Sequence, residues 1–288
     1  MPRMTDVILE PANAMRDWLC REPPKATAFI VTIYGDVVAP RGGTLWMGSL
    51  IDCCADHGIN ESLVRTAVSR LVSSGRLEGQ RIGRKSFYRL SEAAQVEFAE
   101  ASRVLYAPPP DATGWLLSLN SIGPAPGWAG IGGGHSMAPD RADLTPSEGL
   151  VFSADAPVNN LSLQVFAAKY WPLGEVTAAY ERFLAVFESV AEELGKHSID
   201  EGLALALRLR LVHLYRHAAL RDPRLPADAL PKDWPGHAAR RLFVNTYLSL
   251  SVDADREVGA KFADDEGLLS VGTEETYARI ERLEREQE

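Results

Sequence analysis

Arginine and hydroxyl side chains gather on one side of a short predicted helix that runs from Asn60 to about Ser74. They lie opposite an apolar stripe at helical spacing, so they should face away from the core. Guanidinium and hydroxyl groups on such a face can donate hydrogen bonds to phosphates and to base edges. We expect DNA contacts from Arg65, Thr66, Ser69 and Arg70. The alternative is a solvated face, although such faces more often carry Glu and Lys pairs.

This helix needs a neighbour to hold it at a surface. Asn60 is a suitable N-cap, and Ile59 and Val64 have the spacing of a hydrophobic staple. A preceding helix is predicted from Leu45 to His57, with Gly58 as the residue that ends it. Two helices joined by so short a turn form a helix-turn-helix motif.

A basic β-hairpin is predicted after the helix pair, from Arg76 to Leu90, with a cationic turn at Gly83. The helix pair and the hairpin together predict a winged helix-turn-helix, which reads the DNA major groove with its second helix. Arg41 is expected to bind phosphate beside the first amides of the Leu45 helix. Arg76 could equally be a plain surface residue. The expected backbone or minor-groove contacts of the hairpin are Arg76, Arg81, Arg84 and Lys85.

Charge is distributed unevenly along the 288 residues. The whole chain carries 30 Lys and Arg against 39 Asp and Glu, a formal net charge of -9. A generally basic, nucleic-acid-coating protein is therefore excluded. Residues 59–90 hold seven basic and two acidic side chains, a local charge of +5. One positive face on an acidic molecule is the pattern expected when only that face meets a polyanion.

The rest of the chain divides by composition. Pro108-Pro109-Pro110 is a predicted domain boundary, because consecutive prolines end helices and stiffen the chain. A small β-containing domain is expected next, and from Glu175 onward the 3.6-residue period predicts helices, one with a Ser198–Glu201 capping box. The apolar runs assigned to the β domain are 115–119, 149–152 and 161–167. We therefore predict an α+β protein with domains at 1–106, 107–172 and 173–288.

The three cysteines are Cys20, Cys53 and Cys54. An odd count with an adjacent pair suits a reducing compartment. The pair could serve metal or redox chemistry, but no further Cys or near His gives zinc-ligand spacing, which favours small apolar fillers in a helix.

The uncharged stretch 112–139 holds seven Gly and three Pro, so it cannot span a membrane as a helix. With no secretory signal pattern, we expect a cytoplasmic protein.

The residues of the first third and of the helical part closely resemble the PaaX-like transcriptional regulators, a family named for the repressor of phenylacetic acid catabolism. In the first third the resemblance rests on Gly35-Asp36, Pro40-Arg41-Gly42-Gly43, residues 45–50 (LWMGSL), Gly58-Ile59-Asn60-Glu61, 64–71 (VRTAVSRL) and 81–90 (RIGRKSFYRL). In the helical part it rests on Trp171-Pro172-Leu173, Leu220-Arg221-Asp222-Pro223 and Asp233-Trp234-Pro235-Gly236.

The resemblance implies a homodimeric winged-helix repressor of a catabolic operon, for phenylacetate or a related aromatic acid. It would bind an imperfect inverted repeat in double-stranded DNA and leave it when an aromatic acyl-CoA thioester binds. It also implies a central ferredoxin-like domain related to the Cas2 fold. Here Ile122 to Trp128 leave no room for the usual helix, so we expect that domain to be trimmed or distorted.

A second basic cluster lies on and after the predicted Ser198 helix. Acyl-CoA thioesters carry several phosphate charges, so the implied effector requires a cationic pocket outside the DNA-binding region. The same residues would also suit a helix that neutralises an acidic domain or pairs across a dimer interface. The expected effector contacts are Arg208, Arg210, His213, Arg216, His217, Arg221 and Arg224.

Other functions stay open. Within the family, the chain could regulate a different acyl-CoA pathway, also as an activator. In another class, a Cas2-like domain suggests a metal-dependent nuclease or an RNA-interacting module. Such a nuclease would need a carboxylate at the end of its first strand to hold the metal ion. Asn120 and Ser121 stand there, and His135 beside flexible glycines is a weak catalytic candidate. Finding no catalytic motif, we expect no enzymatic activity, no metal and no cofactor.

Overall fold

The computed structural model describes residues 11–123, 125–144, 149–155 and 163–287. Helices and two antiparallel sheets make up this part of the chain, so the predicted α+β class is confirmed. The apolar run 27–34 is helical, and the chain continues through a π-helical and a 3-10 turn. The first elements are α1 (Pro11–Arg21), α2 (Ala26–Ile33), η1 (Tyr34–Val38) and η2 (Ala39–Arg41).

The predicted helix pair is present as α3 (Met47–Ala55) and α4 (Glu61–Ser73). The Asn60 side chain accepts a hydrogen bond from the backbone amide of Leu63 at 3.0 Å, so the predicted N-cap is confirmed. Gly58 has φ +70°, and a Cβ there would lie 2.8 Å from the backbone oxygen of Cys20. Only glycine suits this turn, because both the conformation and the space exclude a side chain.

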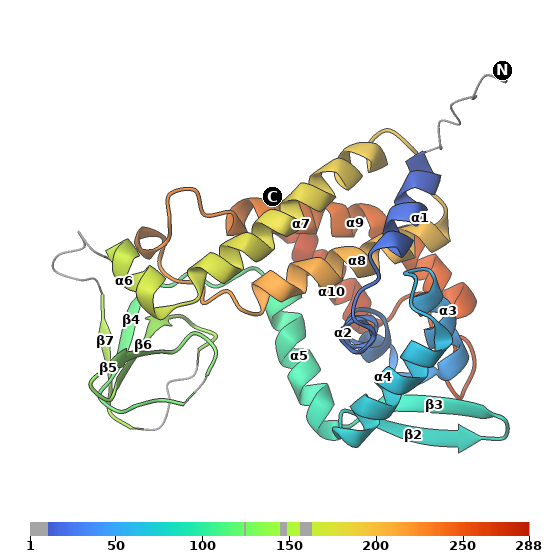
Figure 1. Ribbon diagram of the computed structural model, residues 1–288, viewed down its shortest axis with the longest axis horizontal. Helices are drawn as coiled ribbons and strands as arrows, with labels where there is room; N and C mark the ends of the chain where they lie inside the picture. Colours follow the sequence, from blue (N-terminus) through green and yellow to red (C-terminus); the bar gives the residue numbers. More distant parts are fainter. Residues whose placement is uncertain (1–10, 124, 145–148, 156–162, 288) are drawn as a thin grey trace, which may run out of the picture.

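The predicted hairpin is also present, and it belongs to a small sheet. Its strands are β2 (Leu77–Ile82) and β3 (Lys85–Leu90), and β1 (Thr44–Trp46) adds a third, in the order β1-β3-β2. The side chain of Ser91 accepts a hydrogen bond from the backbone amide of Ala94 and caps the start of α5 (Glu92–Tyr106). This helix leads from the hairpin to the second sheet (Figure 1).

The second sheet has the strand order β5-β6-β4-β7, with all neighbours antiparallel. Among the described residues between β4 and β5 there is no helix, as the sequence predicted. The run 161–167 was assigned to the β domain, and this is wrong for its described part, because residues 163–167 begin helix α6. The elements are β4 (Gly114–Ser118), β5 (Ala129–Gly132), β6 (His135–Asp140), β7 (Val151–Ala154) and α6 (Leu163–Tyr170).

The C-terminal part is helical, as predicted, and α8 lies at its centre. Fourteen of the nineteen α8 residues are buried, because the helix packs against α7, α9, α1 and α2. Its N-cap is Asp200, whose side chain accepts from the amide of Leu203, and the predicted Ser198 capping box is wrong. The elements are α7 (Leu173–Leu194), α8 (Glu201–Ala219), η3 (Ala227–Ala229), α9 (Gly236–Lys261) and α10 (Glu274–Arg285).

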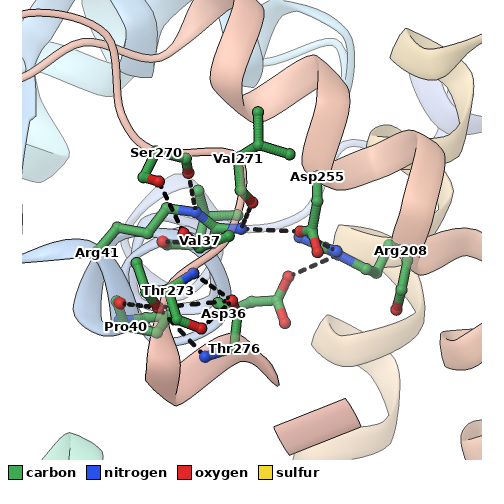
Figure 2. Close-up of polar contacts among 12 residues, drawn as sticks. Asp36, Val37, Pro40, Arg41, Arg208, Asp255, Ser270, Val271, Thr273 and Thr276 are labelled. Atoms are coloured by element: carbon green, nitrogen blue, oxygen red, sulfur yellow. Dashed lines mark hydrogen bonds and ion pairs between the residues drawn. The ribbon is translucent and has the colours of Figure 1, made fainter. Parts of the chain in front are cut away.

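A single hydrophobic core joins the first and last thirds of the chain. At its centre lies Asp36, on the π-helical turn, which is fully buried between the guanidinium groups of Arg208 and Arg279 at 3.0 and 3.2 Å. The hydroxyls of Tyr106 and Tyr247 donate to the same carboxylate at 2.8 and 2.9 Å. This cluster ties η1 to α5, α8, α9 and α10, so the first third of the chain is packed on the C-terminal helices (Figure 1). Figure 2 shows the contact between Asp36 and Arg208.

The pKa of Asp36 lies below its ordinary value, which shows that the surroundings stabilise the ionised carboxylate. Burial alone would raise it, but Arg208, Arg279 and the two tyrosine hydroxyls bring the pKa below its ordinary value. The cluster therefore holds a negative charge in the core only because its partners surround it.

A buried histidine makes the stability of the fold depend on pH. Burial, with Arg216 and His217 nearby, lowers the pKa of His213 to about 3. The unfolded chain has an ordinary histidine pKa near 6.5, so below that pH it binds a proton that the folded chain does not, and stability falls. We expect His213 to account for a loss of about 2 kcal/mol in the free energy of unfolding between pH 7 and pH 5.

Urea unfolding at the two pH values measures this loss. A His213→Asn variant keeps an acceptor for the Thr32 hydroxyl, which lies 2.9 Å from His213 Nδ1. It should lose less stability over the same range. Equal losses in the variant and the parent would contradict the assignment.

Candidate nucleic-acid interface

The outward face of α4 carries the residues that the sequence placed there. Arg65, Thr66, Ser69 and Arg70 are all exposed, whereas Val64, Ala67, Val68 and Leu71 are buried against the core. The apolar stripe thus fixes which way the polar residues point. Helix α4 lies at the surface of the molecule, beside the β2–β3 hairpin (Figure 1).

The hairpin lies beside α4 and forms a groove with it. Arg65, Ser69 and Ser73 line one side of the groove, and Gln80 and Arg81 line the other. Predicted residues from the helix and from the hairpin therefore meet on one continuous surface. The hairpin extends beyond the end of α4, at the opposite end of the molecule from the β4–β7 sheet (Figure 1).

The tip of the hairpin is exposed and cationic, with Arg81, Arg84 and Lys85 in solvent. The ammonium group of Lys85 lies 4.6 Å from the ring centre of Trp46, a cation–π contact. Such a contact keeps the ammonium close to the sheet while leaving it charged and accessible.

Three basic residues of this surface pair with acidic neighbours. Arg65 contacts Glu61 at 2.7 Å, and Arg76 contacts Glu97 at 2.7 Å, while Arg89 contacts Glu78. Their side chains stay 56%, 44% and 64% exposed. Exposed ion pairs contribute little stability, so a phosphate or a base edge can replace the carboxylate at low cost.

Arg41 does not belong to this surface, and its predicted role as a phosphate anchor is wrong. Its guanidinium is 1% exposed and donates to the backbone oxygens of Val37, Ser270 and Val271 (Figure 2). It also pairs with Asp255 at 2.9 Å. Burial in the core leaves no donor of Arg41 for DNA. The helix expected from Leu45 begins at Met47, after β1.

The second basic cluster is not one pocket. Arg208 is buried between Asp36 and Asp255, Arg210 donates to the backbone oxygens of Leu19 and Glu22, and His213 is also buried. The prediction that these three contact an effector is wrong, because their polar atoms face protein partners. Arg208 neutralises buried carboxylates, whereas Arg210 and His213 join α8 to the segments packed on it. Of the three, only Arg208 fits the alternative interpretation of a helix that neutralises acidic groups.

The other four members of that cluster separate from one another. Arg216 is partly buried and donates to Thr32 Oγ1 and to the backbone oxygen of Ala28. His217 and Arg221 are exposed. Arg224, half-buried, lines a large cavity beside α9. Of the seven predicted residues, Arg224 alone lines that cavity.

The cysteine pair lies inside α3, as expected for apolar fillers. Burial raises the pKa of the Cys53 thiol well above its usual value and that of Cys54 to about 12. Neither is a reactive thiolate at neutral pH.

Among the residues that the structure describes, no three His, Cys, Asp or Glu side chains are placed to hold a metal ion. Nor does that part of the chain contain a helix both long and apolar enough to cross a bilayer.

Sequence reasoning missed two features. The buried Asp36 cluster was present in the sequence only as a lone carboxylate inside an apolar run, residues 27–38, and its arginine partners stand more than 170 positions away. The cavity beside α9 was also missed, although the motif Asp233-Trp234-Pro235-Gly236 supplies part of its wall.

Two family models match parts of the chain, one in the first third and one in the helical C-terminal part. The family model "PaaX-like protein" matches residues 25–94, and "PaaX-like protein C-terminal domain" matches residues 171–260. The chain belongs to the family of PaaX-like proteins. The two matches cover α2 through the start of α5 and α7 through most of α9.

Two relatives show the extent of the likeness. The chain is 32% identical, over 283 aligned positions, to "Transcriptional repressor PaaX" of Escherichia coli (strain K12), covering 87% of this chain and 86% of the relative. Among solved structures it is similar to "Uncharacterized protein Rv0674 from Mycobacterium tuberculosis", at 22% identity and a TM-score of 0.47, over 81% of this chain and 98% of that one.

Proposed function

We propose that this chain is a sequence-specific DNA-binding repressor whose recognition element is α4. One observation carries the proposal: the exposed arginine and hydroxyl face of α4 adjoins a cationic hairpin across a shared groove. With β1 as the third strand, α2, α3, α4 and the hairpin are proposed to form a winged helix. The relative in Escherichia coli is named a transcriptional repressor, which supports a regulatory, non-enzymatic role in the cytoplasm.

Each part of the surface has its own task in this proposal. Helix α4 enters the major groove, where Arg65 donates to a guanine and Thr66, Ser69 and Arg70 reach bases or phosphates. The hairpin tip follows the backbone or the minor groove. Two copies of the chain would bind an imperfect inverted repeat whose half-sites lie about one DNA turn, or a multiple of it, apart.

The central sheet is proposed to be a shortened ferredoxin-like domain. Numbered within the sheet, its strand order is 4-1-3-2, the order of that fold, but the described residues between its first two strands contain no crossover helix. The regulated operon is proposed to be one for phenylacetate or a related aromatic acid, with release of the operator by an aromatic acyl-CoA. The family membership supports this effector class.

A mobility-shift titration tests the function. The probe is the DNA upstream of the chain's own operon, with phenylacetyl-CoA, other acyl-CoA thioesters or no addition. We expect a specific shift that an aromatic thioester reverses. Absence of any specific shift at low salt would contradict the proposal, and cleavage of the probe with Mg²⁺ or Mn²⁺ would point to a nuclease instead.

Salt dependence provides a separate prediction for Lys85. If four to six phosphates are neutralised by each protomer, operator affinity should fall steeply with salt. Lys85→Ala should reduce the slope of log affinity against log salt by about one per protomer, because one phosphate contact is lost. The matched control is Lys196→Ala, an exposed lysine after α7. An unchanged slope in the Lys85 variant would remove this residue from the phosphate contacts.

A further inference from the structure

A cavity of about 530 Å³ lies where four segments of the chain meet, and none of its walls belongs to the α4 surface. Its volume falls in the range of small-molecule sites. These four are the linker after α5, the end of α8 with the loop that follows it, η3, and the first turn of α9, and Tyr180 of α7 and Glu286 after α10 complete the lining. Pro109 and Pro110 of the linker line it directly.

One wall of the cavity is aromatic. Tyr180 and Trp234 meet edge to face with ring centres 6.0 Å apart, and Tyr215 lies 6.2 Å from Tyr180. Leu225 and Leu230 extend this wall with aliphatic surface. Aromatic side chains in such arrangements favour a further ring in stacked or edge-to-face contact. The wall therefore suits an aryl group.

A second part of the cavity, next to Trp234, attracts negative charge. Helix α9 begins there, and its N-cap is Pro235, which provides no capping side chain. The first amides of a 26-residue helix carry the positive end of its dipole. His237 and Arg241, near the start of α9, also line the cavity, and both side chains are exposed. Within the described part of the chain, Arg241 forms no ion pair.

Most of the acidic residues that line the cavity already form hydrogen bonds or ion pairs with other residues of the lining. The carboxyl group of Asp222 accepts from the Tyr180 hydroxyl at 2.9 Å and from the backbone amide of Arg224 at 2.8 Å. Burial raises the pKa of Asp222. Glu286 is paired with Arg240 at 2.6 Å. Asp111 also lines the cavity, and its side chain is exposed to solvent.

Arg240 connects the cavity to the DNA-binding part. Its guanidinium donates to the backbone oxygens of Leu105 at 2.5 Å and Ala107 at 3.0 Å, at the end of α5. Helix α5 starts directly after the hairpin. A ligand in the cavity would touch both Arg240 and the linker that follows α5, so its presence can change how that helix is held.

From these contacts we infer that this cavity is the effector site and that it binds an organic anion bearing an aryl ring. The ring packs on Tyr180, Tyr215 and Trp234, and the anionic group lies at the first turn of α9 beside Arg241. The regulatory part of this inference rests on the proposed function, whereas the binding part does not.

Calorimetric titration of the full chain tests the site with three probes: phenylacetate, CoA and phenylacetyl-CoA. We expect at least one aryl-bearing probe to bind once per chain. Arg241→Ala should weaken it at least fivefold. Ala227→Trp, which places an indole at the cavity from an exposed position, should abolish binding. Arg221→Ala is the matched control, because Arg221 is exposed and does not line the cavity.

Three outcomes would overturn the inference: no binding of either aryl probe, unchanged affinity in both cavity variants, or a loss in Arg221→Ala equal to that in Arg241→Ala. Operator binding by the same proteins separates this inference from the proposed function. Retained operator binding without aryl binding defeats the inference alone. Aryl binding at the cavity with no operator binding defeats the proposed function and leaves the site standing.

Discussion

Asp36→Ala is expected to lower the free energy of unfolding by about 3–5 kcal/mol, because it leaves two buried guanidinium groups without their carboxylate. Arg208 would keep Asp255 at 2.7 Å and the ring of Tyr247. Arg279 would keep the backbone oxygen of residue 36 at 3.0 Å, the ring of Tyr106 and the hydroxyl of Tyr247. The loss should be visible as a shift of the urea unfolding midpoint at pH 7 with an unchanged slope.

The matched control for this prediction is Asp253→Ala. Asp253 pairs with Arg256 on the exposed side of α9, where both side chains are more than 40% exposed. Removal of an exposed pair should cost at most about 1 kcal/mol. If Asp36→Ala cost no more than this control, the cluster would not be the link that holds the first third of the chain to the C-terminal helices.

Arg65→Ala is expected to reduce operator affinity by about 1–3 kcal/mol, roughly 5-fold to 150-fold, with discrimination relaxed at one base pair of each half-site. The physical reason is the loss of two directed hydrogen bonds to a guanine edge, while the phosphate contacts remain. Stability should hardly change, because the pair that Arg65 forms with Glu61 is exposed. Anisotropy titrations with the operator and with single-base variants measure both effects.

Arg182→Ala on the exposed side of α7 is the control for general loss of positive charge. It should leave operator affinity within about a factor of two, because long-range charge effects are screened at physiological salt. Unchanged affinity and base preference in Arg65→Ala would show that α4 does not read the DNA through this residue.

Local patterns of the sequence predicted the DNA-facing elements well. The Asn60 cap, the stripe from Val64 to Leu71 and the Gly83 turn depend on neighbours within a few positions, and the structure contains all three. The sequence signal was strong because capping, periodicity and turn chemistry act over short distances.

Long-range packing accounts for the failures. Arg41 was assigned to phosphate because it precedes a predicted helix, and Arg208 was assigned to the effector because it lies in a basic cluster. In the structure, both pair with the carboxylate of Asp255 inside the core. No local pattern shows that α8 is covered on nearly every side. The short run 161–167 failed for another reason, since an apolar stretch of that length fits a strand or a helix equally well.

The packing also gives a route by which an effector could act. Arg240 holds the end of α5 from the cavity side, and Asp36 holds the start of the same DNA-binding part through Arg208 and Arg279. Both links end on the C-terminal helices. A ligand that changes the position of α9 or of the linker therefore acts on elements that carry α4.

The most direct test of the central claim, that α4 lies on the operator, is cleavage of DNA by an iron chelate attached to Ser73→Cys. The protein would also carry Cys20→Ser, because Cys53 and Cys54 are buried and do not react. The account predicts cuts centred in the major groove of each half-site, and none from a chelate at Asp228→Cys on the far side of the chain. Cuts from position 228 with none from position 73 would contradict it.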